Sequence, residues 1–155
     1  MKKLLATLVL ALMTLPVMAD TVGMVNYREL VANYAKAKSA MSELEDKTNE
    51  LQRYLLDKEQ EFKKLDSAVQ KKNFEDATAK QFAQKQDALE KYRIKKETEI
   101  DAAITGAIKQ VAMENNIQTV VDSRVVFFGG VDITDKVLKK LNLICLIIYE
   151  KNCQE

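Results

Sequence analysis

The sequence contains no histidine, so it lacks the side chain that serves most often as a general base and as a metal ligand near neutral pH. It also has no paired-cysteine metal motif and no glycine-rich phosphate loop, since Gly129-Gly130 alone is too short to form one. These absences exclude the commonest catalytic arrangements. We therefore predict that the protein is not an enzyme and that it has no catalytic residue, no metal ligand and no cofactor.

Helix-breaking residues are scarce as well, with four glycines and one proline in 155 residues. The proline lies in an N-terminal segment typical of an export signal, in which two lysines precede a mostly apolar run over residues 4–15 and small residues end at Ala19. We expect cleavage after Ala19, which makes residues 1–19 a signal peptide. An uncleaved anchor is less favoured, because the apolar run is shorter than the roughly 20 residues that span a bilayer.

An excess of charge of one sign is also missing. The chain carries 24 Lys and Arg against 23 Asp and Glu, a formal net charge of +1. Loss of the two signal lysines would leave the mature chain slightly negative. A nearly neutral chain is not expected to bind nucleic acid, which normally requires a net basic surface. Abundant but balanced charge is instead typical of long helices with solvated faces.

Long helices are the main prediction for the mature chain. Between residues 41 and 69, apolar residues recur at alternating steps of three and four, which is the spacing of a coiled-coil seam. The series is Met41, Leu44, Leu51, Leu55, Phe62, Leu65 and Val69. Only Thr48 and Lys58 interrupt it. A stripe of this length requires a partner helix, and the next part of the same chain can supply one.

A reversal of the chain is predicted near residues 70–76, where polar residues dilute the pattern and Asn73 is the best point for a helix to stop. A return arm that ends at Asn115-Asn116 then carries apolar residues at helical spacing: Phe82, Leu89, Tyr92, Ile100, Ile104, Ile108 and Val111. The two arms predict an antiparallel coiled-coil hairpin over about residues 27–116. The outgoing arm would tolerate a bend near Lys38-Ser39.

Strand-forming residues flank this hairpin on both sides. Residues 21–25 predict a short strand that stops at Asn26, and Asn26 with Glu29 forms a capping box that starts the first helix. Residues 117–121 and 125–128 are β-branched and aromatic runs that predict two more strands, or one bent strand with a turn at residues 122–124. Because the hairpin returns to where it began, these segments can pair in one small sheet.

A short helix is predicted to close the fold. Asp132, with Asp135 three residues later, predicts its N-terminal cap, and apolar residues follow at Ile133, Val137, Leu138 and Leu141. The predicted fold class is α+β and mostly α, with a small β body formed by both chain ends, residues 20–26 and 117–142, and a long helical hairpin, or tentacle, between them. Asp122, Asp132 and Asp135 could also hold a cation for a metal-dependent hydrolase, but turn and capping roles explain them more simply.

Several of these segments resemble the Skp (OmpH-type) family of periplasmic chaperones. The resemblance covers residues 21–142 and rests on Val22-Gly23-Met24-Val25-Asn26, on "VVDSRVVFFGG" and on "DITDKVLKKLN". It implies one periplasmic domain over residues 20–155 that forms a homotrimer, with a shared β body and three arms around a cavity. It further implies an ATP-independent holdase that binds unfolded outer-membrane proteins and prevents their aggregation.

The resemblance also suggests which residues would serve each role. The candidates to face a client on the arms are Met41, Tyr54, Leu56, Phe62, Phe74, Phe82 and Tyr92. The oligomer body would use Val22, Met24, Val120, Val125 and Phe127. A basic distal end is formed by Lys63, Lys64, Lys71, Lys72 and Lys80, and it could attract acidic clients or an anionic membrane surface.

The sequence leaves open the function of the chain, the role of its tail and the pairing of its two cysteines. A structural coiled-coil spacer or adaptor within the cell envelope is the alternative function, since many unrelated proteins share the periodicity of the arms. The tail over residues 143–155 departs from the family pattern with an apolar run, Leu143 to Tyr149, which could be an extra strand, a partner-binding segment or an altered reading of the gene's end. Cys145 and Cys153 could pair with each other or with another chain in an oxidising compartment.

Overall fold

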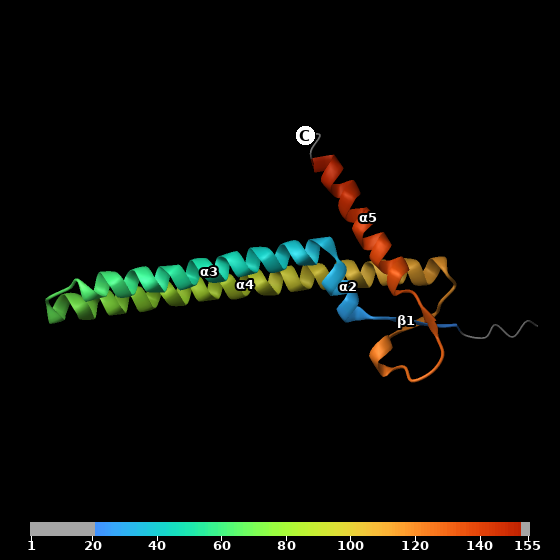
Figure 1. Cartoon of the computed structure of the whole chain (residues 1–155), viewed down its shortest axis with the longest axis horizontal. Coiled ribbons are helices and arrows are strands. Elements are labelled where there is room, and N and C mark those ends of the chain that lie inside the picture. Colours follow the sequence, from blue (N-terminus) through green and yellow to red (C-terminus); the bar gives the residue numbers. More distant parts are fainter. Residues whose placement is uncertain (1–20, 153–155) are drawn as a thin grey trace, which may run out of the picture.

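The computed structural model describes residues 21–152, so the predicted signal peptide and Cys153 lie outside the described residues. The described chain is mostly helical and carries one small sheet (Figure 1). Its elements are β1 (Val22–Val25), α2 (Tyr27–Asn33), α3 (Ala35–Lys63), α4 (Ala68–Glu114), β2 (Thr119–Asp122), the 3-10 turn η1 (Ser123–Val125), β3 (Val131–Asp132) and α5 (Thr134–Asn152). The prediction of a mostly helical chain with a small three-stranded sheet is confirmed.

The two long helices, α3 and α4, lie side by side, and the chain runs out along one and back along the other (Figure 1). The predicted reversal at residues 70–76 is wrong, because α3 ends at Lys63 and α4 begins at Ala68, so that Asn73 lies within a helix. The turn follows from packing across the arms. The rings of Phe62 and Phe74 meet with centroids 6.2 Å apart, a contact that is possible because the chain reverses between them.

The first helix begins where the capping box predicts. The Asn26 side-chain oxygen accepts a hydrogen bond from the Glu29 backbone N–H at 3.2 Å, and the Asn26 amide donates to the Glu29 carboxylate at the same distance. The backbone N–H of Asn26 donates to the Thr134 hydroxyl at 2.9 Å. The start of α2 is therefore tied to the start of α5, more than a hundred residues later.

The outgoing arm breaks at Tyr34, not near Lys38-Ser39 as the sequence allowed. Tyr34 is buried and has extended backbone angles, φ −73° and ψ 120°, which separate α2 from α3. The Asn142 side chain of α5 accepts a hydrogen bond from the Ala35 backbone N–H at 3.1 Å. Tyr34 occupies the N-cap position of α3, but its side chain makes no capping hydrogen bond to the helix. The Asn142 side chain caps α3 instead, from outside the helix.

Replacement of Asn142 by alanine is expected to destabilise the fold by about 1 kcal/mol, the usual value of a helix cap. Urea unfolding followed by circular dichroism would measure the change. Asn142→Asp is the matched control, because a carboxylate retains the acceptor and also carries a charge that favours a helix N-terminus. Equal losses in both variants would contradict the capping role.

The sheet has the order β2-β1-β3, and both pairings are parallel. The predicted strand over residues 125–128 is wrong, since Ser123–Val125 forms a 3-10 turn and Phe127 and Phe128 are almost fully exposed. The Asp122 carboxylate accepts a hydrogen bond from the Arg124 N–H at 2.9 Å and so ends β2 in a turn. Gly129 and Gly130, with φ of 82° and 93°, then redirect the chain, so that Val131 pairs with Gly23.

The core lies at the base of the hairpin, where α2, α4 and α5 meet. Its largest fully buried side chains are Leu30, Ile104, Ile133, Leu141 and Val137. The end of α4 is fixed here as predicted, because Asn116 adopts a left-handed φ of 53° and the N–H of Ile117 donates to the carbonyl of Ala112 at 2.9 Å. No residue from 41 to 103 is buried, so the arm has no core of its own.

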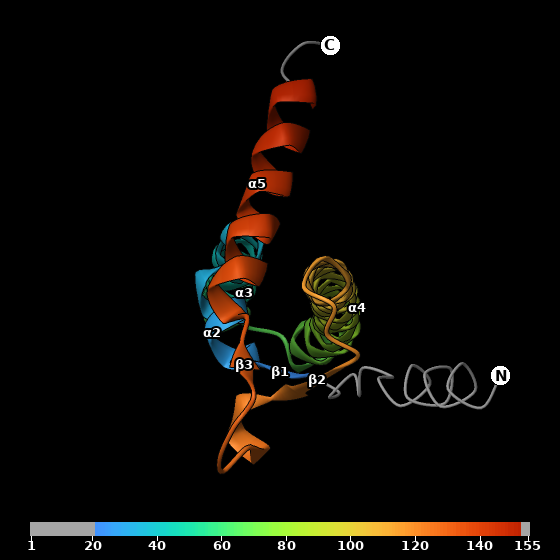
Figure 2. The same cartoon turned by 90° about the vertical axis from the view of Figure 1, so that its right-hand side faces the viewer.

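The closing helix is longer than predicted. Its cap is confirmed, since the Asp132 carboxylate accepts a hydrogen bond from the Thr134 N–H at 2.9 Å. However, α5 does not stop at residue 142 but continues to Asn152 and projects away from the hairpin (Figures 1 and 2). The residues 143–152 therefore extend a helix, and the reading of this segment as an extra strand is wrong.

Candidate binding surfaces

Three tyrosine hydroxyls cross between the outgoing and the returning halves of the arm. Tyr27 donates to the Asp101 carboxylate at 2.8 Å near the base, and Tyr54 donates to the side-chain oxygen of Gln81 at 2.7 Å farther out. Between them, Tyr92 donates to the Glu43 carboxylate, and this hydrogen bond lowers the pKa of Glu43. The arms are thus joined by polar contacts at intervals along their length.

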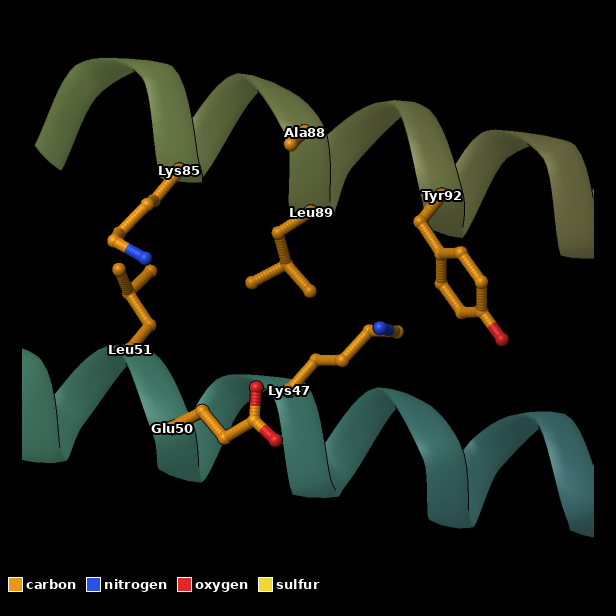
Figure 3. Close-up of a pocket in the computed structure, with 7 residues that line it drawn as sticks. All are labelled: Lys47, Glu50, Leu51, Lys85, Ala88, Leu89 and Tyr92. Carbon is orange, nitrogen blue, oxygen red and sulfur yellow. The ribbon is translucent and has the colours of Figure 1, made fainter. Parts of the chain in front are cut away.

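Lysines cover the aromatic rings of the opposite helix. The ammonium groups of Lys47 and Lys85 lie 4.9 Å from the Tyr92 ring and 5.0 Å from the Tyr54 ring, respectively. Lys58 lies 5.6 Å from the Phe74 ring, so this residue does not interrupt the seam but occupies it. Figure 3 shows how Lys47 and Lys85 flank the gap into which Leu51 and Leu89 point. The result is a seam of apolar and aromatic side chains interleaved with cations.

Tyr27 has the most perturbed hydroxyl among the bridges. Burial, the hydrogen bond to Asp101 and the charge of that carboxylate together raise the pKa of Tyr27 to about 12. Because the folded pKa lies above the unfolded value of about 10, the contribution of this bridge to stability is complete below pH 10 and is lost as pH rises through 12.

An ultraviolet titration of the folded protein should therefore contain a tyrosinate transition near pH 12 that disappears in Tyr27→Phe. Asp101→Asn, which keeps an acceptor but removes the charge, should lower this pKa only partly, because burial is the larger cause. A transition near pH 12 of undiminished amplitude in Tyr27→Phe would contradict the assignment; some late titration is expected to remain, because the hydrogen bond to Glu43 also raises the pKa of Tyr92.

The candidate client-facing residues lie in different parts of the arm. Phe62, Phe74 and Phe82 line one distal groove of about 330 Å³, together with the exposed Leu55, which the sequence had placed only in the seam. Met41 and Tyr92 line a cavity near the base, whereas Tyr54 bridges the arms and Leu56 is exposed. Two further exposed apolar residues, Val69 and Ile94, were not among the candidates.

The predicted basic end surrounds the tip of the hairpin. Lys63 and Lys64 flank the turn, but Lys63 pairs with Glu59 at 2.6 Å. Lys71 lies over the Phe62 ring at 5.7 Å. Lys64, Lys72 and Lys80 are exposed, and none of them forms an ion pair within residues 21–143. Of the five lysines predicted to form the basic end, these three have neither an ion pair nor a contact with an aromatic ring in the described part of the chain.

The candidate body residues lie around the sheet. Val22 and Met24 are on β1, and Val120, on β2, packs against the core. Val125 and Phe127 lie beyond β2 and are exposed, as is Phe128, which the sequence had not singled out. Val131 and Met113 are further exposed apolar residues at this end of the molecule. Such a concentration of exposed apolar side chains is typical of a surface that another protein covers.

Two of the three acidic residues that could have held a cation, Asp122 and Asp132, are otherwise engaged. The Asp122 carboxylate is paired with Arg124 at 2.9 Å, and this pairing lowers the pKa of Asp122 to about 2. Asp132 accepts hydrogen bonds from the N–H and hydroxyl of Thr134. Within the described residues, no group of three His, Cys, Asp or Glu side chains is arranged to hold a metal ion.

A small mixed body that carries a long helical arm defines the class of protein, and exposed apolar side chains are spread along both parts. The family model described as outer membrane protein (OmpH-like) matches residues 21–141, and this chain belongs to that family. The family includes periplasmic chaperones. No curated protein matches the chain.

The length and apolar character of the helices indicate whether any of them could cross a membrane. Over the part of the chain that the structure describes, none of the helices combines the length and apolar character needed to cross a bilayer.

Proposed function

We propose that this protein is an ATP-independent periplasmic holdase that binds unfolded outer-membrane proteins between its helical arms and prevents their aggregation. The proposal rests on the exposure of the apolar and aromatic side chains along the arm. From residue 41 to residue 103 the apolar and aromatic side chains are half-buried or exposed and none is buried. Such a surface can shelter many different apolar segments without fixing any of them in one conformation.

The lysines of the seam support this reading. Lys47, Lys58 and Lys85 keep charge beside the aromatic rings, so the arm remains soluble while its apolar surface stays within reach. A structural spacer would have no need for exposed apolar residues such as Met41 and Leu56, which are 66% and 59% exposed. Membership of the OmpH-like family agrees with a chaperone role.

Aggregation of a denatured outer-membrane β-barrel on dilution tests the proposal directly. The mature chain, without nucleotide, is expected to suppress light scattering at stoichiometric amounts, whereas an unrelated exported protein at equal mass should not. Continued aggregation at a stoichiometric excess, together with tight binding to one defined envelope partner, would contradict the holdase and favour a spacer or adaptor.

The proposal also covers the export of the chain, the arrangement of its long helices and the charge at the tip of the arm. Cleavage after Ala19 would release residues 20–155 into the periplasm. α3 and α4 would form an antiparallel coiled coil, with a tip whose exposed lysines, Lys64, Lys72 and Lys80, attract acidic clients or an anionic membrane surface. Raising the salt concentration should weaken that attraction, because exposed charges are screened beyond about 10 Å at 0.1 M salt.

We also propose that the body assembles as a homotrimer. A three-stranded sheet with a two-residue edge strand is only marginally stable alone, and Phe127 and Phe128 leave a large apolar surface beside it. Light scattering on the mature chain should give the mass of a trimer. The double variant Phe127→Ser, Phe128→Ser is expected to dissociate it, whereas Leu56→Ser, at an exposed apolar site on the arm, should not. A double variant that stays trimeric would contradict this interface.

A further inference from the structure

The far end of α5 projects clear of α3 and α4, as both views of the chain show (Figures 1 and 2). Leu141 is 2% exposed and belongs to the core, whereas Leu143, two residues later, is 58% exposed. The helix then continues to Asn152, which is about 14 Å further at 1.5 Å per residue. The core therefore holds the first part of α5, and the helix then leaves it.

The sequence of this projecting end is unusual for a helix in water. Residues 143–149 read "LICLIIY", with no charged residue over about two turns of helix. A helix that lacks a polar side is normally buried. The run is also too short to cross a bilayer, which takes roughly 20 residues. A cover that the helix can enter from the side is therefore required.

Basic groups adjoin this apolar run on the same surface. A groove of about 320 Å³ lies between α5 and the end of α4. The residues of α5 that line it are Lys136, Lys139, Lys140 and Leu143. Lys136 donates to the side chain of Asn115, and Lys140 pairs with Glu114. Lys139 is exposed and forms no ion pair within residues 21–143. Because Glu114 is the only acidic residue of the lining, the groove is positively charged.

We propose that α5 docks this end of the chain on an anionic phospholipid membrane, with its three groove lysines against the lipid phosphates and residues 143–149 in the interface. Helices in the interface are held by buried apolar area together with the attraction of lysines to anionic lipid. A lysine keeps its ammonium at the level of the headgroups while its methylene groups lie along the apolar layer. The two halves of α5 supply these two contributions.

The polar residues that follow the apolar run define how the helix would lie. Glu150, Lys151 and Asn152 end α5, so a helix that entered the bilayer end-on would carry two charges into it first. Charged side chains are costly in the hydrocarbon region. We therefore expect α5 to lie along the membrane surface, with polar residues on both sides of the apolar run.

The charges of α5 favour a membrane over a second copy of the chain. The helix carries four lysines against Asp135 and Glu150. A symmetric contact between copies brings the same surface patch together with itself, and here that places lysine beside lysine. Anionic lipids instead attract juxtamembrane lysines. The contact does not depend on the holdase function, and it differs from the attraction proposed for the tip because salt does not screen its apolar part.

The chain contains no tryptophan, so a single introduced one reports on its own surroundings. Ile147→Trp in the mature chain should shift its fluorescence to shorter wavelength when vesicles of phosphatidylcholine and phosphatidylglycerol are added. Ile94→Trp is the matched control on the arm, at a residue that is 50% exposed, and its fluorescence should not shift. Vesicles of phosphatidylcholine alone should produce a much weaker response in Ile147→Trp.

The same fluorescence titration tests the lysines. Lys139→Gln, added to Ile147→Trp, should weaken binding to the anionic vesicles about fivefold, which is the contribution of one lysine near such a surface. Lys109→Gln is the matched control, because Lys109 is also exposed and forms no ion pair within residues 21–143. It should leave the affinity unchanged.

Each other result overturns the proposal. A shift of equal size in Ile94→Trp would show that the arm meets the lipid. Equal affinity of Lys139→Gln, or equal binding to vesicles without phosphatidylglycerol, would remove the role of the lysines. If the fluorescence of Ile147→Trp lies at short wavelength before vesicles are added, and Leu143→Asp lowers the mass in solution, a second copy of the chain covers the segment instead.

Discussion

Replacing Ile104 by alanine is expected to lower the free energy of unfolding by about 2–5 kcal/mol, the largest effect of any single truncation proposed for this chain. Ile104 is fully buried and lies in the core cluster at the base of α4. Its removal leaves a cavity among residues of α2, α4 and α5 that the fixed helix ends cannot close. Urea unfolding followed by circular dichroism would measure the loss.

Ile94→Ala on the same helix is the matched control. Ile94 is half-exposed on the arm, so the same truncation removes little buried surface there and should cost well under about 1 kcal/mol. Comparable losses at the two sites would contradict the view that the core is confined to the base. Hydrogen exchange should show the same contrast, with slow exchange near Ile104 and fast exchange along the arm.

Gly23→Ala should be the second most damaging substitution. A Cβ atom at Gly23 would lie 2.9 Å from the Cγ2 methyl of Ile117, which is itself buried and held by the hydrogen bond that ends α4. The sheet or the end of α4 must therefore shift, at an expected cost of about 1–3 kcal/mol. Thermal unfolding would measure this loss.

Gly106→Ala is expected to have the opposite sign. Gly106 lies within α4, and a Cβ there would meet nothing within 4 Å. Alanine should then stabilise the helix by about 0.5–1 kcal/mol. If both substitutions destabilise, the Cβ contact at Gly23 is not the cause of its loss. A Gly106→Ala variant that fails to assemble would instead place this glycine at a contact between copies of the chain.

The sequence predicted those parts of the fold that short-range chemistry decides. Asn26 and Glu29 start α2 through hydrogen bonds three residues apart, and Asn116 ends α4 because asparagine tolerates a left-handed conformation. Asp132 caps α5 through the N–H two residues on. Each of these signals acts within one turn of chain, so residue type and spacing suffice to find it.

The errors occurred where distant residues decide. Asn73 is a weak helix former, but the chain reverses before it because Phe62 and Phe74 meet across the arms. The α2–α3 break depends on Asn142, 107 residues beyond Ala35. Phe127 and Phe128 have the residue type of a strand but are not in the sheet, since the glycines after them bring Val131 to β1 instead.

The binding surfaces were harder to predict than the fold. A hydropathy pattern counts Lys58 as a polar interruption, although its ammonium lies over the Phe74 ring and its side chain is only 26% exposed. The cavity that Met41 and Tyr92 line near the base lies close to the break at Tyr34, and no pattern of apolar residues in the sequence marks such a space.

The length of α4 determines how far its tip is displaced when the helix tilts. It runs unbroken from Ala68 to Glu114, and its buried residues, Ile104, Ala107, Val111 and Ala112, lie only at the end that the core holds. The part beyond the core, 68–103, is about 54 Å long at 1.5 Å per residue. It therefore acts as a lever, in which a tilt of about 5° at the fulcrum displaces the tip by about 5 Å. Any small tilt at the base would therefore displace the tip of the arm far more than the part beside the core.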